Sequence, residues 1–244
     1  MYVKHVDFNG IENENMKIWR YMDFAKFVSL LNEQSLFFTR IDKFEDRFEG
    51  SFSVANEQLR PAVYGGNPPS QAMYYATEKI FNETKPFIIA NCWHINPHES
   101  AAMWKLYLKS NEGIAIQSTF KRLADSFTET SKDVYIEKIR YIDYEKDWMH
   151  EGNVYYPLLH KRKSFEHEKE LRAFIDESYM DEEDKICGPS ISGGINVSVN
   201  VETLIENIYV SPDAPKWFSD LVKSITNKYG IQKPVEQSKL KVLY

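Results

Sequence analysis

The chain has 244 residues, with 30 Lys and Arg against 36 Asp and Glu, so its formal net charge is −6. Hydrophobic residues make up 43% of the chain and aromatic residues 14%, which excludes a disordered protein and supplies a substantial core. The acidic balance argues against a protein that coats nucleic acid, although a local basic groove is compatible with it.

Neither a membrane span nor an export signal is evident. No apolar run approaches the ~20 residues that cross a bilayer. Residues 1–7 lack both the basic start and the apolar stretch of a signal peptide. The two cysteines, Cys92 and Cys187, cannot form a disulfide framework, which fits a reducing compartment. We therefore expect a cytoplasmic protein with no membrane partner.

The chain shows no repeat, no low-complexity tract and no convincing linker between domains. Its loosest stretches, residues 65–70 and 181–194, are too short to force a domain boundary. Short strands alternate irregularly with helices, which favours the α+β class. We predict one domain over residues 1–244, with a central, mostly antiparallel sheet, split or continuous, flanked by helices.

In chain order, the first helix signal follows Trp19–Tyr21. Asp23 can cap a helix in which Phe24, Phe27, Val28 and Leu31 share one face. Further helices are predicted over 68–84, from Asn96 and Pro97 through Leu108, and from 213–215 to before Gly230. Strands are predicted at residues 36–39, 87–93, 113–118, 134–142, 169–175, 195–199 and 205–210.

Several catalytic motifs are absent from the sequence. There is no G-x-G-x-x-G after a strand and no P-loop, so the usual glycine-rich phosphate cradles are missing. H-E-x-x-H, paired C-x-x-C and G-x-S-x-G are also missing, and we expect no metal. Cys92 lies in an apolar strand and is predicted to be a buried small hydrophobe, not a nucleophile.

Three clusters of residues are candidates for chemistry. Trp19, Arg20 and Tyr21 offer a guanidinium beside aromatic rings, which suits an anion next to a stacking surface. A core-edge strand with one solvated arginine is the structural alternative. Residues 39–50 form an aromatic-anchored loop with paired charges: Arg40, Asp42, Phe44, Glu45, Asp46, Arg47, Phe48 and Glu49.

The third cluster lies at residues 163–173. If a strand begins at Glu168, its period of two places Glu168, Glu170 and Arg172 on one face. Like charges on one strand face repel each other unless a positive group lies opposite. Such a carboxylate pair suits general-base work or the stabilisation of a developing positive charge, and a solvated edge strand is the alternative.

These clusters resemble a widespread bacterial family of uncharacterised domains. That family combines an aromatic-rich opening strand and helix with F-x-D-x-F-E, C-x-W…M-W-x-x-Y and E-x-E-L-R motifs. The matching segments are residues 19–31, 44–49, 92–107 and 168–172, followed by residues 209–212. They cover most of the chain in order, but the family name records no activity.

The order of the clusters also resembles that of ADP-ribosyltransferases. That resemblance implies that Arg20 holds the NAD pyrophosphate, that an aromatic ring of the Trp93, Trp104 and Tyr107 group stacks on nicotinamide, and that Glu170 meets the nicotinamide ribose. Tyr21 also belongs to the cofactor-binding residues that it implies. Glu168 would then orient or deprotonate the acceptor. It further implies a cofactor-binding set of Trp93, Trp104, Tyr107, Ser118 and Thr119, and a catalytic set of Glu170, Glu168 and Arg172.

The function hypothesis is therefore an NAD-dependent ADP-ribosyltransferase-like toxin or phage-defence effector. NAD would be its substrate, a protein or nucleic acid the acceptor, and an antitoxin or defence-system component its partner.

Two other classes of function stay open. One is a metal-dependent nuclease in which Asp42, Asp46, Glu49 and Glu168 hold Mg²⁺. The other is a non-enzymatic binding module with a basic segment at residues 160–163. Its aromatic groove would consist of Trp93, Trp104, Tyr107, Tyr155 and Tyr156.

Overall fold

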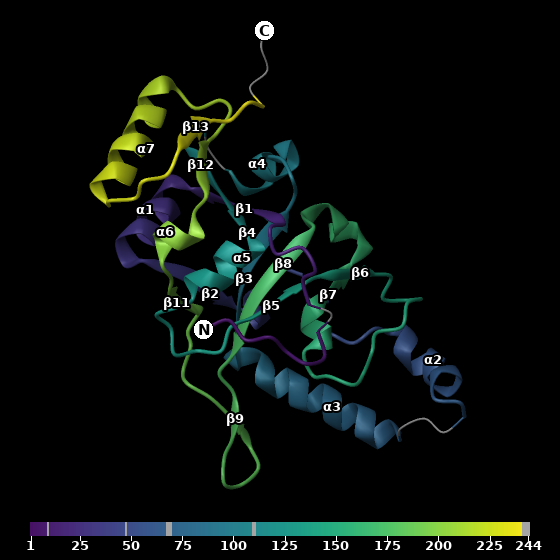
Figure 1. Ribbon diagram of the computed structural model, residues 1–244. Helices are drawn as coiled ribbons and strands as arrows, with labels where there is room; N and C mark the ends of the chain where they lie inside the picture. Colours follow the sequence, from purple (N-terminus) through teal and green to yellow (C-terminus); the bar gives the residue numbers. More distant parts are fainter. Residues whose placement is uncertain (9, 47, 67–69, 109–110, 241–244) are drawn as a thin grey trace.

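The computed structural model describes residues 1–8, 10–46, 48–66, 70–108 and 111–240. Arg47 of the charged loop and Pro68 at the predicted helix start lie outside the described residues. The described chain builds a nine-stranded sheet with helices against it, and two separate two-stranded sheets (Figure 1). No described helix has the length and apolar character that a bilayer crossing requires.

The helices and strands have the following bounds. The described helices are α1 (Phe24–Glu33), α2 (Ala55–Val63), α3 (Gln71–Thr84), α4 (Ala101–Tyr107), α5 (Phe120–Ser126), α6 (Val201–Leu204) and α7 (Lys216–Lys228). The described strands are β1 (Lys17–Asp23), β2 (Ser35–Arg40), β3 (Ile88–Ile95), β4 (Gly113–Thr119), β5 (Tyr135–Lys138), β6 (Arg140–Ile142), β7 (His160–Arg162), β8 (Glu170–Asp176), β9 (Tyr179–Met180), β10 (Ile186–Cys187), β11 (Gly194–Ser198), β12 (Asn207–Val210) and β13 (Val235–Gln237).

Strand β3 is the centre of the large sheet, and its two edges differ. Along one edge, β8 pairs with β3 from Ile88 to His94. The other edge is shared, because β2 pairs with residues 89–90 and β1 pairs with residues 94–95. Within the described chain no strand pairs with residues 91–93 on that edge. We call this gap between β1 and β2 the fork.

Side chains bridge the fork where the backbone ladder is interrupted. The Asn91 amide donates to the Phe37 carbonyl oxygen at 2.8 Å and accepts a bond from the Trp93 indole, also at 2.8 Å. On the other side, the Arg20 guanidinium donates to the Cys92 carbonyl oxygen at 2.6 Å. Backbone groups without a strand partner are costly to bury unless something else bonds them. The side chains of Asn91 and Arg20 therefore supply hydrogen bonds at the fork that a neighbouring strand would otherwise make.

Helix α1 connects the two strands that diverge at the fork. Its first turn is capped by the Asp23 carboxylate, which accepts a hydrogen bond from the Lys26 backbone N–H at 2.8 Å. Phe27, Leu30 and Leu31 form its buried face. The predicted cap and apolar periodicity of this helix are confirmed.

Two layers cover the sheet. One face carries the main core, in which α1, α5, α6 and α7 pack on strand residues such as Ile18, Ile116 and Ile208. On the other face, α4 places Met103 and Trp104 over Trp19 and Tyr21. Helix α3 contributes Phe81 to a further cluster, and in Figure 1 it lies with α2 at the end opposite α7.

The predicted α+β class with a mostly antiparallel sheet is confirmed. Every pair in the large sheet is antiparallel except β12 with β13. The prediction allowed a split sheet, and the fork is the place where β1 and β2 separate along β3.

One predicted helix start was wrong. Helix α4 begins at Ala101 under a Ser100 cap, not at Asn96 and Pro97. The reason is that the backbone of residues 95 and 96 still bonds distant segments: the Ile95 N–H donates to the Lys169 carbonyl, and the Asn96 N–H donates to the Lys17 carbonyl. The local capping pattern at Asn96 and Pro97 therefore does not start the helix, because hydrogen bonds to residues distant in the sequence hold this segment extended.

The predicted strand over 134–142 divides into two strands. β5 pairs with β8, whereas β6 leaves the sheet and pairs with β7. The predicted strand that included Glu168 and Lys169 begins instead at Glu170, because residues 163–168 form a 3₁₀ turn and Lys169 has a φ of 42°. Helices α2, α5 and α6 were not predicted.

We predict that Asn91→Ala destabilises the fold by about 2–4 kcal/mol, since it removes the partner of the buried Trp93 indole N–H and of the partly buried Phe37 carbonyl. Urea unfolding measures the loss. Asn15 is exposed, and its side chain has no hydrogen-bond partner among the described residues, so Asn15→Ala should stay within about 0.5 kcal/mol of the parent. Equal stability of the two variants would contradict the bridging role.

Candidate functional site

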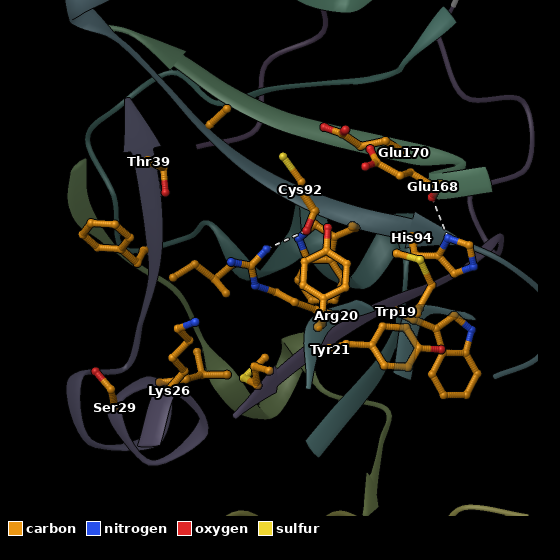
Figure 2. Close-up of a pocket in the computed structure, with 18 of the residues that line it drawn as sticks. Trp19, Arg20, Tyr21, Lys26, Ser29, Thr39, Cys92, His94, Glu168 and Glu170 are labelled. Atoms are coloured by element: carbon orange, nitrogen blue, oxygen red, sulfur yellow. Dashed lines mark hydrogen bonds between the residues drawn. The ribbon is translucent and has the colours of Figure 1, made fainter. Parts of the chain in front are cut away.

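A pocket of about 610 Å³ opens at the fork. Its walls come from β1, α1, β2, β3 and α4, together with the segment that leads into β8. Figure 2 shows Glu168 and Glu170 along one wall, Arg20 below Cys92 near the centre, and Lys26 and Ser29 at the far end. A volume of this size suits a ligand of cofactor dimensions.

Arg20 is the cation at the centre of the pocket. Only one hydrogen bond holds its guanidinium among the described residues, the one to the Cys92 carbonyl. Burial lowers the pKa of Arg20, but a guanidinium keeps its charge in proteins. Its remaining N–H groups are therefore available to an anionic ligand.

Behind the acidic wall lies a buried network of three carboxylates and two cations. The Lys161 ammonium contacts Glu49 at 2.8 Å, Glu168 at 2.6 Å and Glu170 at 2.8 Å. Arg172 contacts Glu49 at 2.9 Å and Glu170 at 2.7 Å. We call these five residues the carboxylate network.

The network decides the charge state of Glu170. Burial alone would raise the pKa of this carboxyl group, but Arg172 and Lys161 beside it hold that pKa well below its usual range. Opposite charges at hydrogen-bond distance favour the ionised form. Glu170 is therefore a permanent negative charge at the pocket wall.

The two pocket carboxylates differ in how many of their oxygens are already bonded. The Glu170 side chain is 4% exposed, and both of its oxygens pair with cations. Glu168 is 14% exposed, and only its Oε2 is bonded within the described residues, to Lys161. Its Oε1 is the acceptor that a ligand can reach.

Cys92 and His94 complete the acidic wall. Burial and the neighbouring Glu170 raise the pKa of the Cys92 thiol, which therefore stays protonated. Burial lowers the pKa of His94, whose Nδ1 donates to the Glu168 carbonyl at 2.6 Å. Its Nε2 is buried without a partner in the described residues, so it is an acceptor that a ligand can satisfy.

The predicted aromatic residues separate into two groups. Tyr21, Trp93 and Tyr107 line the pocket, and Tyr107 is the most accessible of them at 48% exposed. Trp104 does not line it. Instead the Trp104 ring packs edge-on against Tyr21, with ring centroids 5.0 Å apart, so it supports the wall from behind.

Three other predicted site residues lie outside the pocket lining. Ser118 is fully buried and donates to the Leu204 carbonyl at 2.6 Å, and Thr119 caps helix α5. Arg172 is also fully buried behind Glu170, where Phe44 covers its guanidinium. Arg172 can therefore affect the pocket only through the groups that it contacts, such as Glu170 and Phe44.

The far end of the pocket was not predicted from the sequence. It is lined by polar side chains from α1, β2 and β11 together with an aromatic ring that is 50% exposed, Phe37. The polar residues there are Lys26, Ser29, Ser35, Thr39 and Asn196. Cys92 and His94 were missed as pocket residues as well, because an apolar strand pattern gives no sign that the neighbouring strands diverge.

The charged loop at residues 40–49 does not build a metal centre. Asp42 pairs with Arg40, Asp46 with Arg162, and Glu49 with Lys161 and Arg172. Among the described residues no group of three His, Cys, Asp or Glu side chains is placed to hold a metal ion. The geometry thus gives no support to the nuclease alternative.

The basic segment at residues 160–163 is also occupied internally. His160 is buried and neutral, since burial lowers its pKa to about 4. Arg162 pairs with Asp46, and Lys163 pairs with Asp147. The binding-module hypothesis therefore loses the acidic-ligand contact that it assigned to this segment.

No family model matches the chain, and no curated protein matches its sequence. Among solved structures, it is similar to DarT of Thermus sp. 2.9 in complex with NAD⁺, at 8% identity and a TM-score of 0.40, over 94% of this chain and 98% of that one. The same DarT in complex with ADP-ribosylated ssDNA gives 9% identity and a TM-score of 0.40, over 93% and 96%. The chemistry of the pocket therefore rests on the geometry of this chain.

We predict that the carboxylate network makes the fold sensitive to acid. The folded pKa of Glu170 lies below that of the unfolded chain, about 4.3. Its stabilising contribution is therefore present above that pH and is lost as the pH falls toward the folded pKa. Urea unfolding between pH 2.5 and 7 should show a steep loss below about pH 4.3.

Glu170→Gln removes this group and should reduce the slope below pH 4 by up to about 1.4 kcal/mol per pH unit. Glu129→Gln, the same change at an exposed position, should keep the parent slope. The same slope in Glu170→Gln and in the parent would show that Glu170 is not held ionised by the network.

Proposed function

We propose that the fork pocket binds NAD and transfers its ADP-ribose group to a protein or nucleic-acid acceptor. One observation carries this proposal: Arg20 and the carboxylates of Glu168 and Glu170, about 150 residues apart in the sequence, line the same pocket. An ADP-ribosyl donor has an anionic pyrophosphate and a cationic pyridinium ring. A pocket with a central guanidinium and an acidic wall matches both charges.

The pyrophosphate is assigned to Arg20. A guanidinium can bind two phosphate oxygens at once, and Arg20 uses one N–H on Cys92 with the others unoccupied in the described structure. Lys26, an exposed residue of the pocket wall, provides a second cation toward the far end. Phe37 offers a flat apolar surface there for the adenine ring.

The nicotinamide ribose is assigned to the acidic wall. When the bond between ribose C1′ and the ring nitrogen breaks, its electron pair leaves with neutral nicotinamide and positive charge develops on the ribose. Fixed negative groups stabilise such a transition state without reorganising. The accessible ring of Tyr107 lies on the same pocket wall and can stack on nicotinamide.

The hydrogen bonds favour a division of roles between the two carboxylates. Glu168 Oε1 is free to accept from a ribose hydroxyl, whereas both oxygens of Glu170 are held by cations. In this proposal Glu168 makes the contact, and Glu170 supplies fixed negative charge. This gives Glu168 the ribose contact that the family resemblance implied for Glu170. Arg172 is then a positioning residue.

The acceptor atom forms the new bond to C1′, and its proton passes to Glu168 or to solvent. An enzyme of this kind consumes cellular NAD and modifies cellular targets. We therefore propose a toxin or phage-defence effector that acts in the cytoplasm and is restrained by an antitoxin or defence-system partner.

Incubation of the protein with labelled NAD and cell lysate tests the proposal. We expect labelled products with the parent chain, and about 10²- to 10³-fold slower labelling with Glu168→Gln, the range found when one preorganised stabilising group is removed. Arg20→Met should instead weaken NAD binding, measured by calorimetry. Digestion of the products with protease or nuclease identifies the acceptor class.

Glu129→Gln is the matched control, because it makes the same chemical change on the exposed surface. It should label at the parent rate. Label transfer that is equal in the parent and in Glu168→Gln, or absent from both, would remove the transferase hypothesis.

A further inference from the structure

Lys161 is a buried lysine whose ammonium group lies among three carboxylates. An ammonium group has three N–H donors, and Lys161 contacts three carboxylates at 2.6–2.8 Å. Its side chain is 9% exposed. Lys161 does not line the pocket, and its close partners are carboxylates, so we look for its function in what it does to Glu49, Glu168 and Glu170.

The fold brings Lys161 to these carboxylates through a side structure of the sheet. β7 pairs in parallel with β6, with Lys161 opposite Tyr141. The Tyr141 hydroxyl accepts a hydrogen bond from the Glu170 backbone N–H at 2.8 Å, which ties this two-stranded sheet to the start of β8. The 3₁₀ turn over residues 163–168 then returns Glu168 to the ammonium seven positions after Lys161.

The two cations of the network have different tasks. Arg172 pairs with Glu49 and Glu170, and among the described residues it makes no ion pair or hydrogen bond with Glu168. Among the described residues, Lys161 is the cation that pairs with Glu168. It holds Oε2 of that carboxylate, which leaves Oε1 for the pocket.

The charge balance also depends on Lys161. With it, three carboxylates face two cations; without it, they face Arg172 alone. Like charges at this spacing cannot all stay ionised in a dry site, so a network without Lys161 takes up a proton at higher pH. Other groups around the two pocket carboxylates are Arg20, Cys92, His94, Tyr107, Tyr141, His167 and Lys169.

We infer that Lys161 is the positioning residue of the pocket: it aims Glu168 at the ligand and allows Glu168 and Glu170 to be negative together. The inference extends the proposed function, because its catalytic consequence rests on that function. Its structural part, a lysine that sets the protonation of the network, stands without it.

The test compares Lys161→Met with Lys161→Arg. Lys161→Met should lower kcat for NAD turnover about 10- to 100-fold at pH 7 while NAD binding changes less than about threefold, because Arg20 is untouched. The acidic limb of the pH profile of kcat/KM should move up by about one unit or more. Lys161→Arg keeps the charge and should restore the position of that limb.

Lys132→Met is the matched control. Lys132 is a partly buried lysine that pairs with Glu177 at 2.7 Å, outside the pocket. It should change stability without moving the pH profile. A profile for Lys161→Met that coincides with that of Lys132→Met would overturn the positioning role.

A second measurement separates failure of this inference from failure of the proposed function. If the parent chain turns over no NAD, the transferase proposal fails. Urea unfolding as a function of pH then tests whether Lys161 sets the protonation of the carboxylate network. Acid destabilisation of Lys161→Met should then begin at higher pH than in the parent. Identical pH dependence of the two would reject the inference, and Lys161→Gln replaces the methionine variant if that variant does not fold.

Discussion

The pocket depends on one constraint: carboxylates that would repel each other are held together in a dry interior by two cations. Removing such groups from water costs several kcal/mol per ion, and only close contacts and additional hydrogen bonds repay that cost. Arg172 meets this requirement with two carboxylates and the Leu158 carbonyl. Lys161 meets it with three carboxylates. Glu168 and Glu170, which form the acidic wall of the pocket, belong to this buried arrangement. Lys161 and Arg172 therefore fix the positions of the two carboxylates.

The fork is the second element of the site, and it works through the backbone. Because β1 and β2 share one edge of β3, residues 91–93 lie beside a gap where a side chain replaces a strand. Arg20 occupies that gap and bonds the Cys92 carbonyl. The same guanidinium thus completes the sheet and presents charge to the pocket, which explains how an arginine on a central strand is both half-buried and available.

Local signals in the sequence predicted much of the fold. The Asp23 cap, the apolar period of α1 and most strands of the sheet follow from patterns within ten residues. The alternation also predicts that Glu170 and Arg172 share one strand face and that the carboxylates need a positive group opposite them. What local patterns miss is long-range pairing: it moved the start of α4, divided the strand at residues 134–142 and buried Ser118 against Leu204. For the same reason, the sequence places Lys161 only in the basic segment at residues 160–163 and not beside Glu168 and Glu170.

The loop at residues 44–50 limits which substitutions the fold can tolerate in evolution. Glu49 links the loop to both cations of the network, and Phe44 covers the guanidinium of Arg172. Replacement of Arg172 alone would leave three carboxylates sharing one lysine, and replacement of Glu49 alone would take one carboxylate partner from each of Arg172 and Lys161. Substitutions that the fold tolerates at Glu49 and Arg172 should therefore occur together. In related sequences the residue types at these two positions should covary, because the loop and the strand share these ion pairs.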